Sequence, residues 1–102
     1  MAIKKQYLKG KPSCKVTFEL PKEACIDAKT VNIVGEFNDW NIEATPLKKQ
    51  KDGSFKVTLN LDKDREYQYR YLLNGTMWEN DWCADKYVSS VFPDINNSVV
   101  IL

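Results

Sequence analysis

Three side chains in this sequence could together form a ligand-binding surface. Trp40 ends a turn in residues 31–41 (VNIVGEFNDWN), and Trp78 follows a second turn at Asn74-Gly75. Arg70 lies in the alternating segment between them. A tryptophan on a loop can close the end of a core or offer a flat apolar face to a ligand, and arginine supplies a planar set of hydrogen-bond donors. Two loop tryptophans and one strand arginine suggest a ligand platform.

A cluster of acidic residues offers a catalytic alternative. Glu79, Asp81 and Asp85 lie close to two tryptophans in the sequence. Glycosidases use paired carboxylates held about 5–9 Å apart, but acidic residues in a loop are usually a solvated surface. The sequence contains no histidine, nucleophile elbow or glycine-rich phosphate loop. We therefore predict no enzymatic activity and no catalytic residue, with a glycoside hydrolase fragment as the weaker alternative.

Composition indicates one soluble globular domain. The 102 residues suffice for a single core, with 43% hydrophobic and 28% charged residues. A formal net charge of +1 creates no overall field for nucleic acid or an anionic membrane. No apolar run approaches the roughly 20 residues that span a bilayer, and the first residues lack the apolar region of a signal peptide. We expect a cytoplasmic protein that binds neither nucleic acid nor a membrane.

The cysteines predict neither a disulfide framework nor a metal site. Cys14, Cys25 and Cys83 are odd in number, widely spaced and without a Cys-x-x-Cys pair. In the absence of histidine, a zinc site would lack its usual ligands. Cys14 alternates in phase with Val16 and Phe18, so we expect a buried thiol. No metal and no cofactor are predicted.

Short strands separated by turns account for most of the chain. Residues 22–29 form a polar connection with room for a turn of helix, and 51–54 carry an Asp-Gly hairpin turn. Pro46 places its segment at a sheet edge, because proline cannot donate to a central ladder. Six to eight short strands predict an all-β fold, a single antiparallel β-sandwich of immunoglobulin type. The expected strands include residues 14–20, 31–36, 45–47, 55–61, 66–73 and 97–102.

The start of the chain differs in charge from the rest. Residues 1–15 carry five lysines and no acid: Lys4, Lys5, Lys9, Lys11 and Lys15. Such a segment is usually a solvated terminus, although it could dock on an acidic partner. We expect residues 1–13 to form a basic N-terminal arm or an edge strand, and residues 14–102 to form the β-sandwich domain.

Alternation in the tyrosine-rich strand separates structural from functional residues. Tyr67, Tyr69 and Tyr71 alternate with Gln68 and Arg70, so the two sets lie on opposite faces. Three tyrosines in phase are more often core than ligand surface. Arg70 is then expected on the outer face, near the two loop tryptophans. A solvated strand charge is the alternative interpretation of Arg70.

Four segments of the chain resemble one known family. GEFNDWN (35–41), DGSFKVTLNL (52–61), EYQYRYLLNG (66–75) and TMWEND (76–81) are similar to carbohydrate-binding module family 48, also called the isoamylase N-terminal or early-set domain. The glycogen-binding domain of the AMP-activated kinase β subunit is a related module. The resemblance runs from about residue 15 to the C-terminus. It implies an immunoglobulin-like early-set sandwich and a non-catalytic, glycogen- or starch-binding-like domain over residues 14–102.

The resemblance also implies roles for single residues. The tryptophan that ends the GxFNxW segment of glucan-binding members matches Trp40, and the tryptophan after the turn matches Trp78. Their basic strand residue matches Arg70, where the kinase module has lysine. An asparagine just before the last strand matches Asn96 or Asn97.

Two departures from the family pattern concern the region around Trp78. This chain has an extra residue between Gly75 and Trp78, which could shift the ring. It also carries NDWCAD at residues 80–85, where many relatives have a plainer segment. Trp82 in that segment either extends the platform or packs under it.

The ligand implied by the resemblance is an α-1,4-glucan: glycogen, starch or a maltooligosaccharide. Sugar rings would stack on Trp40 and Trp78, while Arg70 would hydrogen-bond their hydroxyls. A separate glucan-active enzyme is a possible partner. The alternative from another class is a protein-interaction or accessory β-sandwich that has lost sugar binding.

Overall fold

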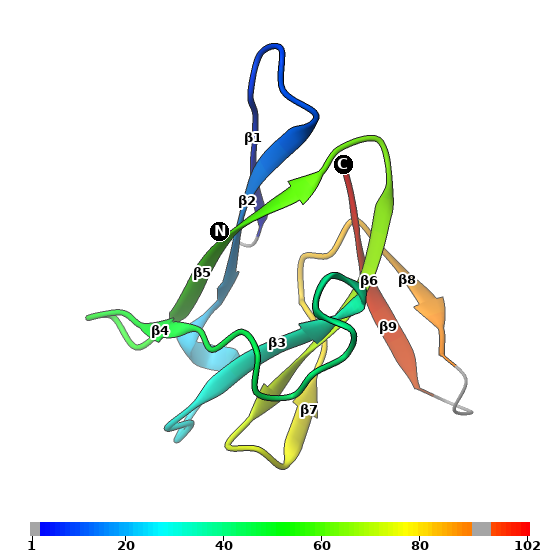
Figure 1. The fold of residues 1–102 in the computed structure, drawn as a ribbon. Helices are drawn as coiled ribbons and strands as arrows, with labels where there is room; N and C mark the ends of the chain where they lie inside the picture. The colour runs from blue at the N-terminus through cyan, green and yellow to red at the C-terminus, as the bar shows by residue number, and fades with distance from the viewer. Residues whose placement is uncertain (1–2, 91–94) are drawn as a thin grey trace.

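The computed structural model describes residues 3–90 and 95–102, whose strands form two antiparallel sheets (Figure 1). One sheet has the spatial order β1 (Ile3–Tyr7), β2 (Ser13–Leu20), β5 (Phe55–Asp62) and β4 (Lys48–Lys49). The other has the order β3 (Val31–Gly35), β6 (Glu66–Leu73), β9 (Asn96–Ile101) and β8 (Lys86–Ser89), and β7 (Met77–Glu79) also pairs with β6. The predicted all-β sandwich is confirmed.

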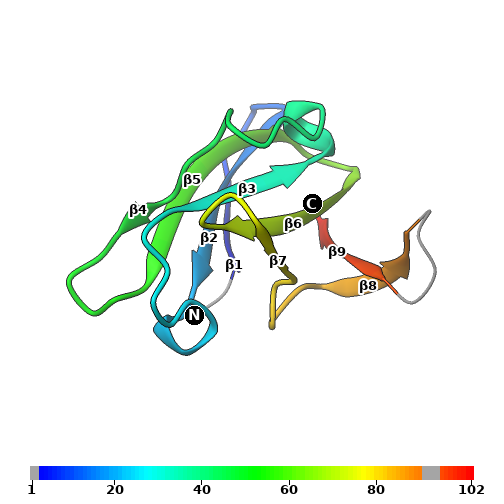
Figure 2. The same ribbon diagram turned by 90° about the horizontal axis from the view of Figure 1, so that it is seen from below.

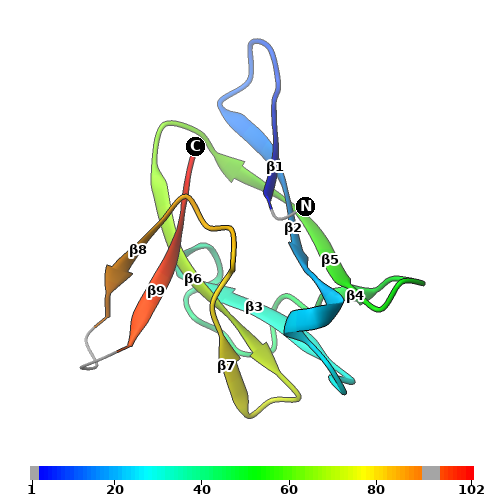
Figure 3. The same ribbon diagram turned by 180° about the vertical axis from the view of Figure 1, so that it is seen from behind.

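The two sheets lie on opposite sides of the molecule. Figure 3 shows β1, β2 and β5 on one side and β6, β9 and β8 on the other. In Figure 2 the β4–β5 hairpin and the β8–β9 hairpin extend in opposite directions. Two single 3₁₀ turns, η1 (Lys22–Ala24) and η2 (Glu36–Asn38), are the helical elements of the described residues. No helix among these residues is long and apolar enough to cross a membrane.

The core between the sheets follows from strand alternation. Every second residue of β2, from Cys14 to Leu20, is fully buried, which confirms the buried thiol. The facing residues of β6 are Tyr67, Tyr69, Tyr71 and Leu73. Tyr69 packs edge-on against Phe18 of β2, with ring centroids 5.1 Å apart. Burial of these rings holds the two sheets together.

The segment around Pro46 passes from one sheet to the other. Thr45 and Leu47 exchange backbone hydrogen bonds with β3, and the first ladder pairs with β5 begin only at Lys48 and Lys49. The predicted edge position of residues 45–47 is confirmed: they lie outside edge strand β3, although Pro46 makes only an isolated bridge there, to Asn32.

The first strand lies at a sheet edge. β1 pairs along its length with β2, from Ile3 opposite Phe18 to Tyr7 opposite Cys14. Lys5 lies opposite the inward-facing Val16, and its Nζ contacts Asp85 Oδ2 at 2.6 Å. The same carboxylate oxygen accepts a hydrogen bond from the Ile101 backbone N–H at the edge of the other sheet. This inward-pointing charge joins the two sheets at the open side of the sandwich.

Strand β6 changes its neighbour halfway along. Its residues Glu66–Tyr69 pair with β9, whereas Tyr71–Leu73 pair with β7, and β3 runs along the other side. Arg70 sits at the point where β9 gives way to β7. The gap between these two strands is bridged by Asn80, whose Nδ2 donates to the Asn96 carbonyl.

Candidate functional site

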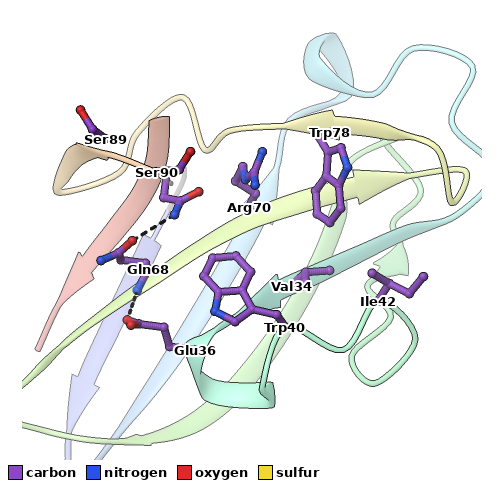
Figure 4. Close-up of a pocket in the computed structure, with 10 residues that line it drawn as sticks. Val34, Glu36, Trp40, Ile42, Gln68, Arg70, Trp78, Ser89 and Ser90 are labelled. Carbon is purple, nitrogen blue, oxygen red and sulfur yellow. Dashed lines mark hydrogen bonds between the residues drawn. The ribbon is translucent and has the colours of Figure 1, made fainter. Parts of the chain in front are cut away.

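The outer face of the second sheet is partly covered, unlike an ordinary solvated sheet face. Val34, Leu72 and Val99 lie on that face by register, outside the inter-sheet core, yet each is at most 3% exposed. Figure 4 shows Trp40 and Ile42 beside Val34 on this face. A second, smaller apolar layer therefore supports the candidate site from below.

The loop that carries Trp40 begins where β3 ends at Gly35. A Cβ on Gly35 would stand only 2.5 Å from the Gln68 carbonyl oxygen and 2.6 Å from the Tyr69 Cβ, so only glycine fits against β6. Asn38 then fixes the turn. Its Oδ1 accepts from the Gly35 N–H, and its Nδ2 donates to the Ile33 carbonyl and the Thr45 hydroxyl, each at 3.0 Å.

The backbone at Trp40 is strained. Asp39 and Trp40 have positive φ angles of 56° and 58°, in the left-handed region that large side chains rarely adopt. The Trp40 N–H donates to the Gly35 carbonyl at 2.9 Å, which closes the turn. Strain of this kind costs on the order of 1–3 kcal/mol and concentrates at functional sites. The turn directs the Trp40 ring over the sheet face, where it remains 37% exposed.

Trp78 is placed by the sheet itself. It lies directly opposite Leu72 in the β6–β7 pair and therefore on the same outer face as Arg70. The guanidinium carbon of Arg70 stands 4.9 Å from the centroid of the Trp78 ring, a cation–π contact. Trp78 keeps 46% of its surface exposed.

The Arg70 cation is available to a ligand. It forms no ion pair with any described residue, and its buried Nε has no hydrogen-bond partner there. Stacking on Trp78 holds the guanidinium plane without using its donors.

Both tryptophans border one hollow of about 640 Å³, which we call the tryptophan hollow. One end is apolar and the other polar (Figure 4). The lining residues are Val34, Glu36, Trp40, Ile42, Gln68, Arg70, Trp78, Ser89, Ser90 and Asn97. Ligand sites commonly combine such an apolar lining with a few convergent polar groups.

A second hollow of about 420 Å³ lies on the β9 side of Arg70 and Trp78. Arg70 and Trp78 border both hollows and so form the ridge between them. The remaining lining residues are Glu79, Asn80, Ile95 and Asn96.

The structure brings together four of the six residues predicted for the site. Trp40, Arg70, Trp78 and Asn97 line the tryptophan hollow, while Asn96 lines only the second one. Trp82 lines neither hollow. It is also 51% exposed, so the alternative in which its ring packs beneath the platform is wrong.

Sequence reasoning missed several residues at the polar end of the tryptophan hollow, notably Glu36, Gln68 and Ser89. The outward register of Gln68 was a usable signal, because the same alternation had placed Arg70. Glu36 contacts Gln68, and Ser89 lines the same hollow, only because distant segments pair, which no local pattern encodes.

The acidic cluster is not a solvated surface at its centre. Asp81 is only 2% exposed, and its Oδ2 accepts from the hydroxyls of Tyr69 and Tyr71 at 2.7 and 3.1 Å. Its Oδ1 accepts from the Cys83 N–H at 2.9 Å, and the Tyr87 hydroxyl donates to its carbonyl. The expectation of exposed acids is therefore wrong for Asp81, which closes one end of the core.

This arrangement shifts the titration of the buried tyrosines. Burial raises the pKa of Tyr69 well above its ordinary value, and the neighbouring Tyr71 hydroxyl and Asp81 carboxylate raise it further. Burial, followed by Asp81, likewise raises the pKa of Tyr71. Both hydroxyls stay protonated and serve as donors to Asp81. The described residues contain no group of three His, Cys, Asp or Glu side chains that could hold a metal ion.

Comparison with known proteins identifies a family. A search of curated proteins found no similar sequence. The model of carbohydrate-binding module 48, described as the isoamylase N-terminal domain, matches residues 26–88. That range contains the Trp40 loop, β6 and β7, and it covers more than half of the chain. The fold is accordingly the immunoglobulin-like early-set sandwich, and the chain belongs to the carbohydrate-binding module 48 family of non-catalytic modules.

Proposed function

We propose that this protein binds linear α-1,4-glucans such as glycogen, starch or maltooligosaccharides. The observation that carries the proposal is the tryptophan hollow. Two partly exposed indole rings and one arginine without an ion-pair partner among the described residues border the same cavity of about 640 Å³. Membership of carbohydrate-binding module 48 supports a glucan as the ligand class.

The chemistry of a pyranose suits this lining. The ring has a face of C–H groups that stacks on an aromatic surface, and its hydroxyl edge requires donors and acceptors. Trp40 and Trp78 offer the aromatic faces, and the guanidinium of Arg70 offers donors between them. Two rings carried by separate elements, a loop and a strand, can stand at an angle and follow the curvature of an α-glucan, whereas cellulose suits a flat row.

A role without turnover is the second part of the proposal. Two of the three clustered acids have structural contacts: the Asp81 carboxylate accepts hydrogen bonds from two tyrosines, and Asp85 pairs with Lys5. Pure protein incubated with maltooligosaccharides is expected to release no reducing ends. Sustained release that disappears in Glu79→Gln would instead favour hydrolysis.

Targeting is the biological role that fits a non-catalytic glucan binder. Such a module holds a separate glucan-active enzyme on the polymer or senses the polymer itself. The cytoplasm, where glycogen is stored, is the compartment we propose. Co-sedimentation of the protein and its candidate enzyme with glycogen particles would test this role.

Affinity electrophoresis tests the binding proposal directly. In native gels cast with glycogen or amylopectin, we expect the wild-type protein to be retarded relative to a polysaccharide-free gel. Trp78→Ala is expected to abolish the retardation, while Trp82→Ala, which removes an indole outside both hollows, serves as the matched control. Unchanged wild-type mobility in both polysaccharides would contradict the proposal and favour a protein-interaction module.

A further inference from the structure

The polar end of the tryptophan hollow contains a row of three hydrogen-bonding side chains. Glu36, Gln68 and Asn97 come from η2, β6 and β9 and line the same cavity. Figure 4 shows Glu36 and Gln68 at the end of the hollow away from Trp78. The row lies beyond Trp40, so a ligand stacked on the two indoles would have to extend past them to reach it.

The row is rigid because the sheet holds it. The β3–β6 ladder ends at Gly35 opposite Tyr69, so the next N–H of β6, that of Gln68, has no strand partner on that side. The Glu36 Oε1 accepts this N–H at 2.7 Å. The Asn97 Nδ2 in turn donates to the Gln68 Oε1 at 3.0 Å. Each side chain is thus oriented by a neighbour before any ligand arrives.

The row also keeps unused hydrogen-bonding capacity. Within residues 3–90 and 95–102, the second carboxylate oxygen of Glu36 and the Nε2 of Gln68 make no hydrogen bond. The Oδ1 of Asn97 is buried without a partner in the same part of the chain, and Asn97 is only 6% exposed. An unpartnered polar atom in a buried side chain is costly, so its presence requires an explanation.

The chemistry of the row favours a neutral polyol. It presents one anionic acceptor and one amide donor side by side, and a hydroxyl group can both donate to the first and accept from the second. A phosphate or carboxylate would be repelled by Glu36, and an apolar ligand would leave the second carboxylate oxygen of Glu36 and the Nε2 of Gln68 unpaired. Neighbouring hydroxyls of one sugar ring satisfy the set.

We propose that Glu36 and Gln68, with Gln68 held in place by Asn97, form a second sugar subsite, which binds the hydroxyls of a glucose unit next to the one stacked on the tryptophans. This inference rests on the proposed glucan binding and adds a specificity to it. The site selects an unsubstituted, neutral glucan chain that is long enough to reach from Trp78 to Glu36. Glu36 is the main specificity-determining residue, because hydrogen bonds to a charged acceptor are the stronger ones.

Calorimetric titration with maltoheptaose tests the subsite. Glu36→Gln retains an acceptor for the Gln68 N–H but removes the charge, and we expect affinity to fall about fivefold to tenfold. Gln68→Met keeps the side-chain length while removing the amide, and we expect a loss of about threefold to fivefold. Glu43→Gln is the matched control, since Glu43 is an exposed acid of the same region outside the hollow. Thermal melts confirm that each variant is folded.

The outcomes separate this proposal from the one it rests on. If Glu36→Gln and Gln68→Met both bind maltoheptaose within about twofold of wild type while Trp78→Ala loses it, the second subsite is refuted and glucan binding stands. If the wild-type protein shows no heat of binding and no retardation by glycogen, glucan binding itself is refuted, and the subsite with it.

Discussion

Aromatic rings lie on both faces of strand β6, and the two groups differ in their exposure and in the contacts that they make within the protein. On the inner face, Tyr69 and Tyr71 are fully buried and donate their hydroxyls to Asp81. On the outer face, Trp40 and Trp78 keep more than a third of their surface exposed. The inner rings complete their contacts within the protein, whereas the outer rings leave one side open.

The two groups of rings also differ in the elements that cover and position them. The inner tyrosines are covered by the opposite sheet, with Phe18 packed against Tyr69. The outer tryptophans lie on the other face of β6 and stay partly exposed. Trp40 is placed by a strained turn, and Arg70 stacks on Trp78. Backbone strain beside partly exposed rings is typical of functional sites.

The largest effect is expected on the inner face. Tyr69→Ala would empty core volume and leave the Asp81 carboxylate with one fewer donor, at a cost of about 3–5 kcal/mol in the free energy of unfolding. Urea denaturation measures this loss. Tyr7→Ala, which removes an exposed tyrosine on edge strand β1, is the control and is expected to cost less than about 1 kcal/mol. Equal losses in the two variants would show that Tyr69 is not a core residue.

On the outer face the expected effect is on binding. Trp78→Ala would remove one of the two stacking surfaces, and we expect at least a thirtyfold loss of glucan affinity, about 2 kcal/mol. The melting temperature is expected to stay within a few degrees of wild type, because the ring is 46% exposed. A variant that binds normally but melts far lower would reverse the assignment of the two faces.

The pH dependence of stability gives a separate test of the inner face. Burial raises the pKa of Tyr69 in the folded state, so the folded protein holds its proton where the unfolded chain, with a pKa of about 10, releases it. Tyr69 thus contributes stability that is complete below about pH 10 and is lost as the pH rises above it, by up to about 1.4 kcal/mol per pH unit.

The Tyr69→Phe variant isolates that contribution. Wild type is expected to be the more stable protein below pH 9, and its advantage is expected to shrink between about pH 10 and pH 11. Urea unfolding of both proteins across this range measures the difference. A difference that stays constant with pH would mean that Tyr69 titrates normally, contrary to its burial.

The smallest effect is expected at the ridge between the two hollows. Arg70→Gln would remove the cation over the Trp78 ring, at a cost of about 0.5–1 kcal/mol in stability. Glucan affinity is expected to fall about fivefold through lost hydrogen bonds. Arg70→Lys, which keeps the charge but loses the planar fork, distinguishes the two contributions. If Arg70→Gln bound glucan with wild-type affinity, Arg70 would be a solvated strand charge with no role in binding.

The alternating sequence pattern correctly predicted which side chains of β6 face the core and which face outward. Alternation in β6 was enough to assign Tyr69 to the core and Arg70 to the outer face, since strand side chains must alternate.

Features that depend on distant pairing could not be predicted in this way. The sequence did not reveal which sheet the edge piece around Pro46 would join: it lies beside β3, and β4 follows in the other sheet at Lys48–Lys49. The sequence around Asp81 gave no sign that this acid is buried, because its two hydroxyl donors come from β6. The Glu36 row likewise forms from three separate elements, which only the register between strands brings together.

Trp40→Ala tests the central claim most directly, when its maltoheptaose titration and its thermal melt are measured beside those of wild type. The claim is that the outer aromatic face binds glucan and contributes little to the fold. We expect saturable binding by wild type, severely weakened binding by the variant, and closely similar melting temperatures. Absence of binding by wild type at millimolar maltoheptaose, or unfolding of Trp40→Ala at room temperature, would contradict the account.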